Sequence, residues 1–238
     1  MSDSQSDRES RAFYDGHYHA GATLVSDVSR HLRRLAHGVC PESRRPVLDV
    51  ACGSGEWLAA VAETGCEAVG IDIASRAIRV AADRVAGGSF VEGVADALPF
   101  RDATFDLVTC LGALEHFADK DAALAEIRRV SRPGAKSLVL VPNAGFLTRR
   151  MGLFHGTEQT AVREDVLSLE AWQQLFERNG FIVEARWRDL HVLSKTWLLR
   201  RGWRHLPFRL LQALMLAVWP LRWQYQVYHL LCPADGGR

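Results

Sequence analysis

The feature of this sequence that most constrains its fold is a short apolar run that leads directly into a glycine loop. Residues 47–55 read Val-Leu-Asp-Val-Ala-Cys-Gly-Ser-Gly, and a pattern typical of a helix follows. Glycine allows the backbone to turn sharply and to come closer to a ligand than a side chain would permit. In α/β sheets a nucleotide-like ligand commonly binds at such a strand-to-helix junction. We therefore expect a ligand site at the loop that contains Gly53 and Gly55.

Two carboxylates accompany this loop. Asp49 lies near the carboxyl end of the first apolar run, and Asp72 ends a second run that begins at Ala68. Asp72 follows Gly55 by 17 residues, and the acid that binds a ribose falls about 20 residues after the loop in nucleotide-binding sheets. The loop is a poor pyrophosphate cradle, because Leu58 occupies the third glycine position and the Walker lysine is absent.

Strand and helix patterns alternate along the chain, which predicts a parallel, doubly wound sheet. The apolar runs at 107–108 and 138–141 are continuous, as expected for strands that are covered on both faces. Ser168 is a suitable N-cap for a late helix, and Gly180 lies just past its end. The expected strands are 46–51, 67–72, 89–92, 105–111, 136–142, 181–187 and 224–232, and the expected helices are 23–36, 55–64, 75–86, 120–131, 168–179, 195–204 and 207–219.

Five segments, in their order along the chain, carry a family resemblance. They are Asp49–Gly55, Gly70–Ile73, Val94–Phe100, Phe105–Cys110 and Arg128–Gly134. With them the chain resembles the class I S-adenosylmethionine-dependent methyltransferases, in particular the type 11 group. One departure is an alanine at the third position of the first segment, where glycine is commonest in that family.

The resemblance covers roughly residues 45–190. It implies an α/β fold with a Rossmann-like doubly wound sheet of about seven strands, mostly parallel with an antiparallel last strand. Residues 1–10 are polar and are expected to form a mobile tail, followed by a single methyltransferase domain over 11–238. Within that domain we expect a helical N-terminal cover and two lid or substrate-binding insertions, the second of them helical, at 11–40, 143–167 and 190–222.

The cofactor that the resemblance implies is S-adenosyl-L-methionine, with S-adenosyl-L-homocysteine as its product. In the resembled family the acid of the second strand binds the ribose, the glycine loop receives the amino acid end, and the third motif contacts the adenine. An ionised carboxylate suits a ribose diol because it accepts two hydrogen bonds. The cofactor-binding residues expected on this basis are Tyr18, Asp49, Ala51, Cys52, Gly53, Gly55, Asp72, Ile73, Asp96, Ala97, Leu98, Leu111 and Gly112.

His116 is the candidate catalytic residue, since it follows the strand 105–111 at the edge where this fold places its active site. An imidazole titrates near neutrality and can act as a general base. A histidine that bonds to the cofactor loop or caps a helix is the alternative. Ubiquinone-biosynthesis O-methyltransferases have a similar Glu-His pair and an earlier glutamate, and bind a divalent ion with the set. Here Gly112 stands at that earlier position, so no metal is predicted.

The acceptor contacts are less constrained by the sequence. Family members carry an N-terminal helix over the cofactor, often with an aromatic hydroxyl near its carboxylate, and Tyr14 and Tyr18 lie in the matching segment. An aromatic pair anchored in the core explains them equally well. The candidate substrate contacts are Tyr14, His155, Glu158, Gln159 and His191.

Methyl transfer is an in-line displacement at a carbon that the positive sulfur already activates, so the enzyme mainly positions the nucleophile and excludes water. The sequence predicts transfer to an oxygen or nitrogen, and less readily to a carbon, of a small molecule such as a sugar, a lipid-linked molecule or a secondary metabolite. Two alternatives stay open: an NAD(P)-dependent oxidoreductase on a similar fold, and a non-catalytic protein that binds S-adenosylmethionine.

Charge and cysteine content narrow the partners. The chain has 29 Lys and Arg against 28 Asp and Glu, so no nucleic acid partner is expected. Its five cysteines show no metal-ligand spacing and suit a reducing cytoplasm. The segment 190–234 lacks Asp and Glu but contains six Lys and Arg and four Trp. Its part 195–222 is either a lid on its own domain or a surface for peripheral membrane contact or homodimer formation.

Overall fold

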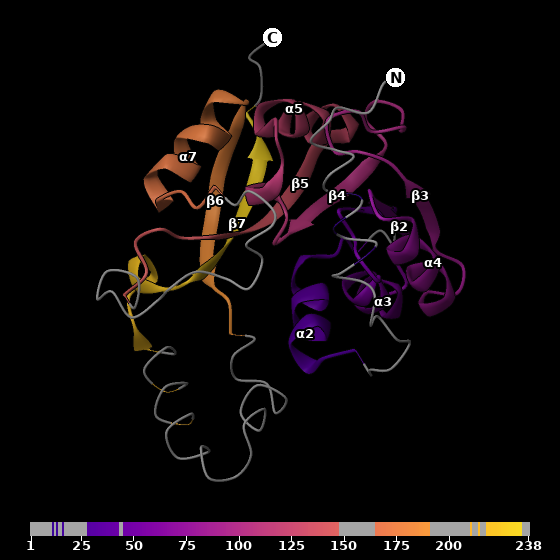
Figure 1. The fold of residues 1–238 in the computed structure, drawn as a ribbon, viewed down its shortest axis with the longest axis horizontal. Helices are drawn as coiled ribbons and strands as arrows, with labels where there is room; N and C mark the ends of the chain where they lie inside the picture. The colour runs from indigo at the N-terminus through magenta and orange to yellow at the C-terminus, as the bar shows by residue number, and fades with distance from the viewer. Residues whose placement is uncertain are drawn as a thin grey trace.

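A mixed sheet of seven strands forms the centre of the computed structural model, which describes residues 11, 13, 16, 28–42, 45–147, 165–190, 210, 214 and 218–234 (Figure 1). The strand order is β3-β2-β1-β4-β5-β7-β6. Strands β1 to β5 pair in parallel, and β7 is antiparallel to both of its neighbours. The strands are β1 (Val47–Val50), β2 (Ala68–Asp72), β3 (Ser89–Glu92), β4 (Phe105–Leu111), β5 (Ser131–Pro142), β6 (Phe181–Arg188) and β7 (Gln226–Pro233). The predicted fold class is confirmed.

Helices cover both faces of this sheet. One apolar core lies between the sheet and the helices α5 and α7, and a second core joins the opposite face to α2 and α3 (Figure 1). Because both faces are covered, β1 and β2 are buried at every position, as their continuous apolar runs predicted. The helices are α2 (Arg30–Val39), α3 (Glu56–Glu63), α4 (Ser75–Arg84), α5 (Lys120–Val130) and α7 (Leu169–Arg178).

Side-chain caps decide where several helices begin. The hydroxyl of Ser168 accepts a hydrogen bond from Ala171 N, which confirms the predicted start of α7. The N-terminal helix was predicted over 23–36; residues 23–27 lie outside the described residues, residues 28 and 29 are not helical, and the predicted end was three residues too early. Ser29 has an extended backbone and accepts from Leu32 N, so α2 begins at Arg30 and continues to Val39.

Strand β5 begins earlier than predicted. Ser131 already pairs with Phe105, and the register then shifts so that Leu107 faces Lys136. The intervening Gly134 has φ 78°, so Pro133 and Gly134 form an irregularity inside the strand. The strand was predicted from residue 136 because Pro133-Gly134 is typical of a turn. The sequence does not reveal that residues on both sides of this dipeptide pair with β4.

The C-terminal part returns to the sheet through a 3₁₀ turn, η5 (Leu221–Trp223). Strand β7 follows two residues later than predicted, and the amide of Asn143 fixes this approach by donating to Arg222 O (2.9 Å) and Gln224 O (3.1 Å). In the part of the chain that the structure describes, every helix is too short or too polar to cross a membrane.

Candidate cofactor site and active site

The loop between β1 and α3 has a left-handed backbone at three positions. Ala51, Gly53 and Gly55 have φ values of 60°, 51° and 75°. Left-handed geometry costs an alanine roughly 1–2 kcal/mol, whereas a glycine adopts it freely. The strain falls where the resembled family most often has glycine, so this loop geometry is held by its surroundings.

Asp72 fastens this loop to the end of β2. One carboxylate oxygen accepts from Gly53 N (2.8 Å) and the other accepts from Ala74 N (2.9 Å). The residue is 7% exposed. The geometry therefore provides a fixed, buried carboxylate at the end of β2.

Gly55 also has a packing role that the sequence did not reveal. A Cβ on Gly55 would lie 2.9 Å from the Cβ of Ala81 in α4. The absent side chain therefore admits α4 to close contact with the loop. Leu58, at the third glycine position, is fully buried in the core against the sheet.

Asp49 is buried beneath the loop in a chain of hydrogen bonds. The indole Nε1 of Trp57 donates to Thr109 Oγ1 (2.9 Å), and this hydroxyl donates to Asp49 Oδ1 (2.6 Å). Burial, together with the nearby charge of Asp72, raises the pKa of Asp49 to about 7, although the Thr109 hydrogen bond opposes this shift. Thr109 and Trp57 were missed by the sequence interpretation. The only sequence signal is a hydroxyl residue inside the apolar run of β4.

Two side chains of α5 hold the loop after β3, the segment expected to contact the adenine. Glu126 accepts from Leu98 N (2.7 Å), and Arg129 donates to Leu98 O (2.9 Å) and Phe100 O (2.8 Å). The Leu98 side chain is buried, while Asp96 is exposed at the surface. This clamp fixes the backbone of the third motif independently of any ligand.

His116 lies in the 3₁₀ turn η2 (Leu114–His116), just beyond the carboxyl end of β4. Gly112, with φ 73°, turns the chain there, and Gly112 N donates to Leu140 O (2.9 Å). Asp165, the first described residue after 148–164, donates its N–H to Glu115 O (3.0 Å) and accepts from Lys120 Nζ (2.9 Å). The segment expected to wall the acceptor pocket therefore returns to the turn that carries His116.

Five other predicted cofactor positions lie within the described residues. Ile73, Leu111 and Gly112 are partly exposed at or just beyond strand ends, Ala97 is partly exposed in the loop after β3, and Cys52 is buried in the glycine loop. Within the described ranges no group of three or more His, Cys, Asp or Glu residues could hold a metal. The remaining predicted positions lie outside the described residues and stay predictions: Tyr14, Tyr18, His155, Glu158, Gln159 and His191.

A second polar cluster, also missed by the sequence interpretation, joins α2 to the last two strands. His31 Nε2 lies 3.2 Å from the hydroxyl of Tyr228 and 3.1 Å from Asp189 Oδ1. Burial and the charge of Asp189 raise the pKa of Tyr228, which keeps its phenol neutral. The cluster ties the N-terminal cover to the end of β6, where the segment expected to form an insertion begins.

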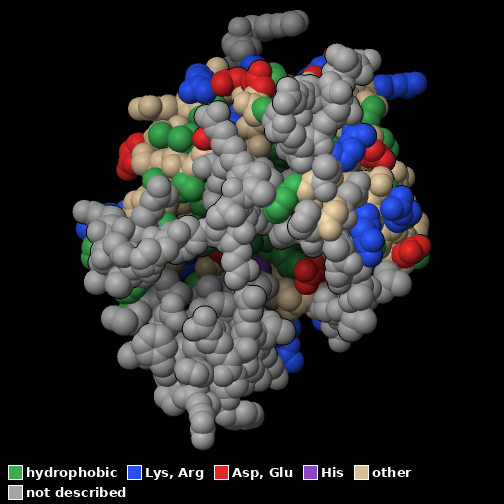
Figure 2. All heavy atoms as spheres, viewed as in Figure 1, with side chains coloured by type: hydrophobic (Ala, Val, Ile, Leu, Met, Phe, Trp, Pro, Cys, Tyr) green, Lys and Arg blue, Asp and Glu red, His purple; other side chains and the backbone are tan. Residues whose placement is uncertain are grey.

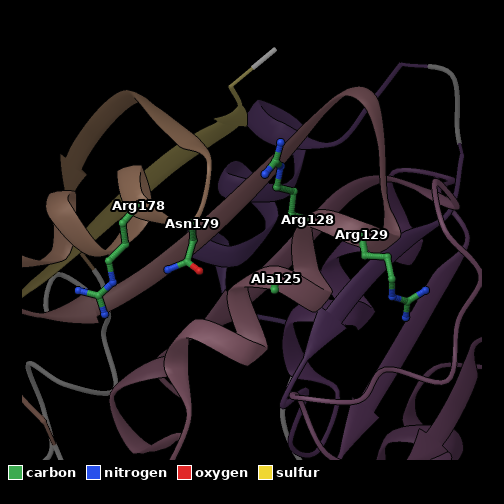
Figure 3. Close-up of a pocket in the computed structure, with 5 residues that line it drawn as sticks. All are labelled: Ala125, Arg128, Arg129, Arg178 and Asn179. Carbon is green, nitrogen blue, oxygen red and sulfur yellow. The ribbon is translucent and has the colours of Figure 1, made fainter. Parts of the chain in front are cut away.

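An open depression of about 490 Å³ lies elsewhere, where α5 and α7 end and β5 and β6 begin (Figure 3). Figure 3 shows Arg129 turned away from Arg178 and Asn179. Arg178 is paired with Asp121 (2.7 Å). Because parallel strands begin at this edge, the depression is at the opposite edge from the glycine loop. The residues that line it are Ala125, Arg128, Arg129, Arg178 and Asn179.

Figure 2 shows one face of the molecule. Described basic side chains lie among acidic ones on this face, and a hollow near the centre of the view is partly lined by hydrophobic and acidic side chains.

The sheet order, the left-handed glycine loop and the acid that closes β2 together define a class: a Rossmann-like protein that binds a nucleoside-type cofactor at the carboxyl ends of β1 and β2. Comparison with known proteins identifies the family. Residues 48–139 match the methyltransferase domain family. The chain is 32% identical over 202 residues to demethylmenaquinone methyltransferase of Renibacterium salmoninarum, covering 82% of each protein. The chain therefore belongs to the class I S-adenosylmethionine-dependent methyltransferases, and the predicted enzyme class and cofactor are confirmed.

Another relative is also named a methyltransferase, and two solved structures share the fold. The ubiquinone/menaquinone biosynthesis C-methyltransferase UbiE of Cupriavidus necator is 43% identical over 102 residues, which is 40% of this chain and 42% of that protein. The structure of YcgJ from Bacillus subtilis has a TM-score of 0.57 at 21% identity, covering 84% of this chain and 96% of that one. Phosphoethanolamine N-methyltransferase 2 of Haemonchus contortus, solved with S-adenosyl-L-methionine, has a TM-score of 0.65 at 16% identity, covering 94% of this chain and 60% of that one. The oxidoreductase and non-catalytic alternatives are set aside.

Proposed function

We propose that this enzyme transfers a methyl group to a ring carbon of a reduced quinone precursor. The supporting observation is the alignment over 82% of the chain with a demethylmenaquinone methyltransferase, together with a relative named as a C-methyltransferase. Carbon was the acceptor atom that the sequence favoured least, because the chemistry of the fold by itself does not select an acceptor. The proposal replaces the sugar or secondary-metabolite acceptor with a quinol.

In this proposal the described loop residues hold the cofactor. The Asp72 carboxylate binds the ribose hydroxyls, and the left-handed backbone at Ala51 and Gly53 borders the amino acid end. Asp49 faces the ammonium group of that end. Within the described residues its contacts include no cationic side chain, so a buried carboxylate that lacks a counter-ion fits an ammonium group. The clamped segment at Leu98 borders the adenine.

Bound S-adenosylmethionine supplies a methyl group on a positive sulfur. A ring carbon of the quinol becomes nucleophilic when a neighbouring hydroxyl loses its proton, so a general base assists. The imidazole of His116 accepts that hydroxyl proton. The new carbon–carbon bond forms as the sulfur–methyl bond breaks and the electron pair stays on sulfur. The proton of that ring carbon then moves to the neighbouring oxygen, which restores the aromatic ring and the hydroxyl.

The acceptor proposal is tested by incubating the purified protein with S-adenosylmethionine and demethylmenaquinol, and by locating the new methyl group with mass spectrometry and NMR. We expect a carbon-bound methyl group with the quinol and no product with the oxidised quinone. His116→Ala should lower kcat by roughly 10²–10⁴-fold. His37→Ala, an exposed histidine in α2, is the matched control. Turnover on oxygen or nitrogen acceptors but not on the quinol would refute the proposal.

We further propose that the segment 190–234, which lacks Asp and Glu, contacts an anionic membrane surface, where a lipid-soluble quinol resides. Leu210, Leu214 and Val218 are helical and 49%, 63% and 70% exposed. A spacing of four is the spacing at which side chains share a face in helices, and the surrounding sequence is rich in arginine. Sedimentation with anionic vesicles should retain the protein, and Leu214→Glu should release it. Equal binding to neutral vesicles, or a homodimer disrupted by the same substitution, would contradict this surface assignment.

A further inference from the structure

The hydrogen-bond chain under the glycine loop connects three elements that are distant in sequence. Asp49 in β1 and Thr109 in β4 are direct partners in the parallel register, so their side chains lie on the same face of the sheet. Trp57 comes from the first turns of α3, which covers that face. Exposure is 5% for Trp57, 0% for Thr109 and 3% for Asp49. Such a chain, shielded from water, affects Asp49 more strongly than a surface contact would.

The indole N–H sets the direction of this chain of hydrogen bonds. The indole N–H can only donate, so Thr109 Oγ1 accepts from Trp57 and keeps its own proton for a second partner. The hydroxyl lies 2.6 Å from Asp49 Oδ1 and 3.3 Å from Leu48 O. The shorter distance is typical of a charge-assisted O–H···O⁻ bond, so the proton is directed at Asp49.

The groups around Asp49 otherwise disfavour its charge. Asp72 at the end of β2 is a like charge. Burial raises the pKa of the Cys52 and Cys110 thiols, so both are neutral and neither offsets the carboxylate. The Thr109 hydroxyl is therefore the one favourable contact to the ionised form among the contacts described for Asp49.

We propose that Trp57 and Thr109 are positioning residues that hold Asp49 ionised, so that it can receive the ammonium group of the amino acid end of S-adenosylmethionine. This inference rests on the proposed role of Asp49 in cofactor binding. It implies that cofactor binding is coupled to loss of the proton from Asp49. In the protonated state the Thr109 hydroxyl can turn to the Leu48 carbonyl, so neither state leaves the hydroxyl proton without an acceptor.

The experiment measures the Kd of S-adenosylhomocysteine by calorimetry from about pH 5.5 to pH 8.5. The variants are Thr109→Val, which removes the hydroxyl at similar volume, Thr109→Ser, which retains it, and Trp57→Phe. Thr64→Val is the matched control, because the Thr64 hydroxyl donates to Val61 O at the far end of α3, away from the glycine loop. Thermal unfolding checks that each variant is folded.

We expect wild-type affinity to rise with pH through the pKa of Asp49, about 7. Thr109→Val should move this midpoint to higher pH, with about tenfold weaker binding near pH 6.5 and less than about twofold near pH 8.5. Trp57→Phe should shift the midpoint in the same direction by less, and Thr109→Ser should restore the wild-type profile. The amino group of the ligand titrates identically in every case and cancels in the comparison.

Each result separates the possible failures. An equal loss of affinity at every pH in Thr109→Val would show a merely structural role and overturn the inference, as would superimposable profiles. If Thr109→Val does not fold, the direction of the Trp57→Phe shift decides instead. Wild-type protein that binds no S-adenosylhomocysteine at any pH would overturn the proposed cofactor site itself, and this inference with it.

Discussion

His229 should make the stability of this protein sensitive to mild acid. Its side chain is fully buried in β7, with Nδ1 3.1 Å from Val227 O and its ring centroid 5.3 Å from that of Phe176. Nε2 has no hydrogen-bond partner among the described atoms. Burial first, and then the positive charge of Arg186, lower the pKa of His229 from 6.5 to about 4. The native state therefore holds the imidazole neutral at a pH where the unfolded chain protonates it.

The sign and size of this pH effect on the free energy of unfolding follow from proton linkage. Between pH 6.5 and 4 the unfolded state binds more protons at His229, so its contribution is complete above pH 6.5 and is lost as the pH falls. A pKa lower by about 2.5 corresponds to at most about 3 kcal/mol in the free energy of unfolding. Asp49 acts in the opposite direction, because its raised pKa favours the native state at low pH. A comparison of variants removes that second effect.

The assay is urea unfolding of the wild type and His229→Leu at several pH values from about 7.5 to 4. We expect the stability advantage of the wild type over the variant to shrink by roughly 2–3 kcal/mol across that range. His37→Leu, at an exposed position on α2, is the matched control. Parallel stability curves for the wild type and His229→Leu would refute the assignment of a buried neutral imidazole.

Three further substitutions test the loop and the core. Asp72→Ala should weaken cofactor binding at least tenfold, because each lost hydrogen bond to the charged carboxylate is worth roughly 1.5–3 kcal/mol; unchanged calorimetric affinity would exclude the ribose role. Gly55→Ala should destabilise the protein by roughly 2–4 kcal/mol in urea unfolding, from its positive φ and its contact with Ala81, whereas Ala51→Gly should cost nothing measurable. Trp172→Ala should cost roughly 3–5 kcal/mol, since the indole is fully buried and donates to a backbone carbonyl.

Gly87→Ala is the control for the loop glycine. Gly87 has φ 82° but no atom lies within 4 Å of a Cβ added there, so this substitution reports backbone strain without steric conflict. An equal loss of stability at Gly55 and Gly87 would show that the contact with α4 contributes nothing. For Trp172, a loss below about 1 kcal/mol would contradict close packing under α7.

Local sequence patterns predicted most of the architecture. The strand from Phe105 to Leu111 and the start of α7 at its Ser168 cap agree with the structure. The errors lie at the ends of strands and helices whose position depends on contacts with other parts of the chain. The pairing of Ser131 with Phe105 extends β5 across Pro133 and Gly134, and the Ser29 cap sets the start of α2 at Arg30. Pairing between strands depends on the tertiary structure, and the periodicity of a single segment does not reveal it.

The sequence by itself determined the order of strands and helices, the glycine loop and the acid at the end of β2, because these depend on residue spacing along one stretch of chain. Only the tertiary structure decided which side chains act on Asp49. Thr109 lies 60 residues away and reaches Asp49 because β1 and β4 pair in parallel, while α3 brings Trp57 over both. The order and register of the sheet place Thr109 beside Asp49. Burial under α3 then strengthens the hydrogen bond between these two side chains.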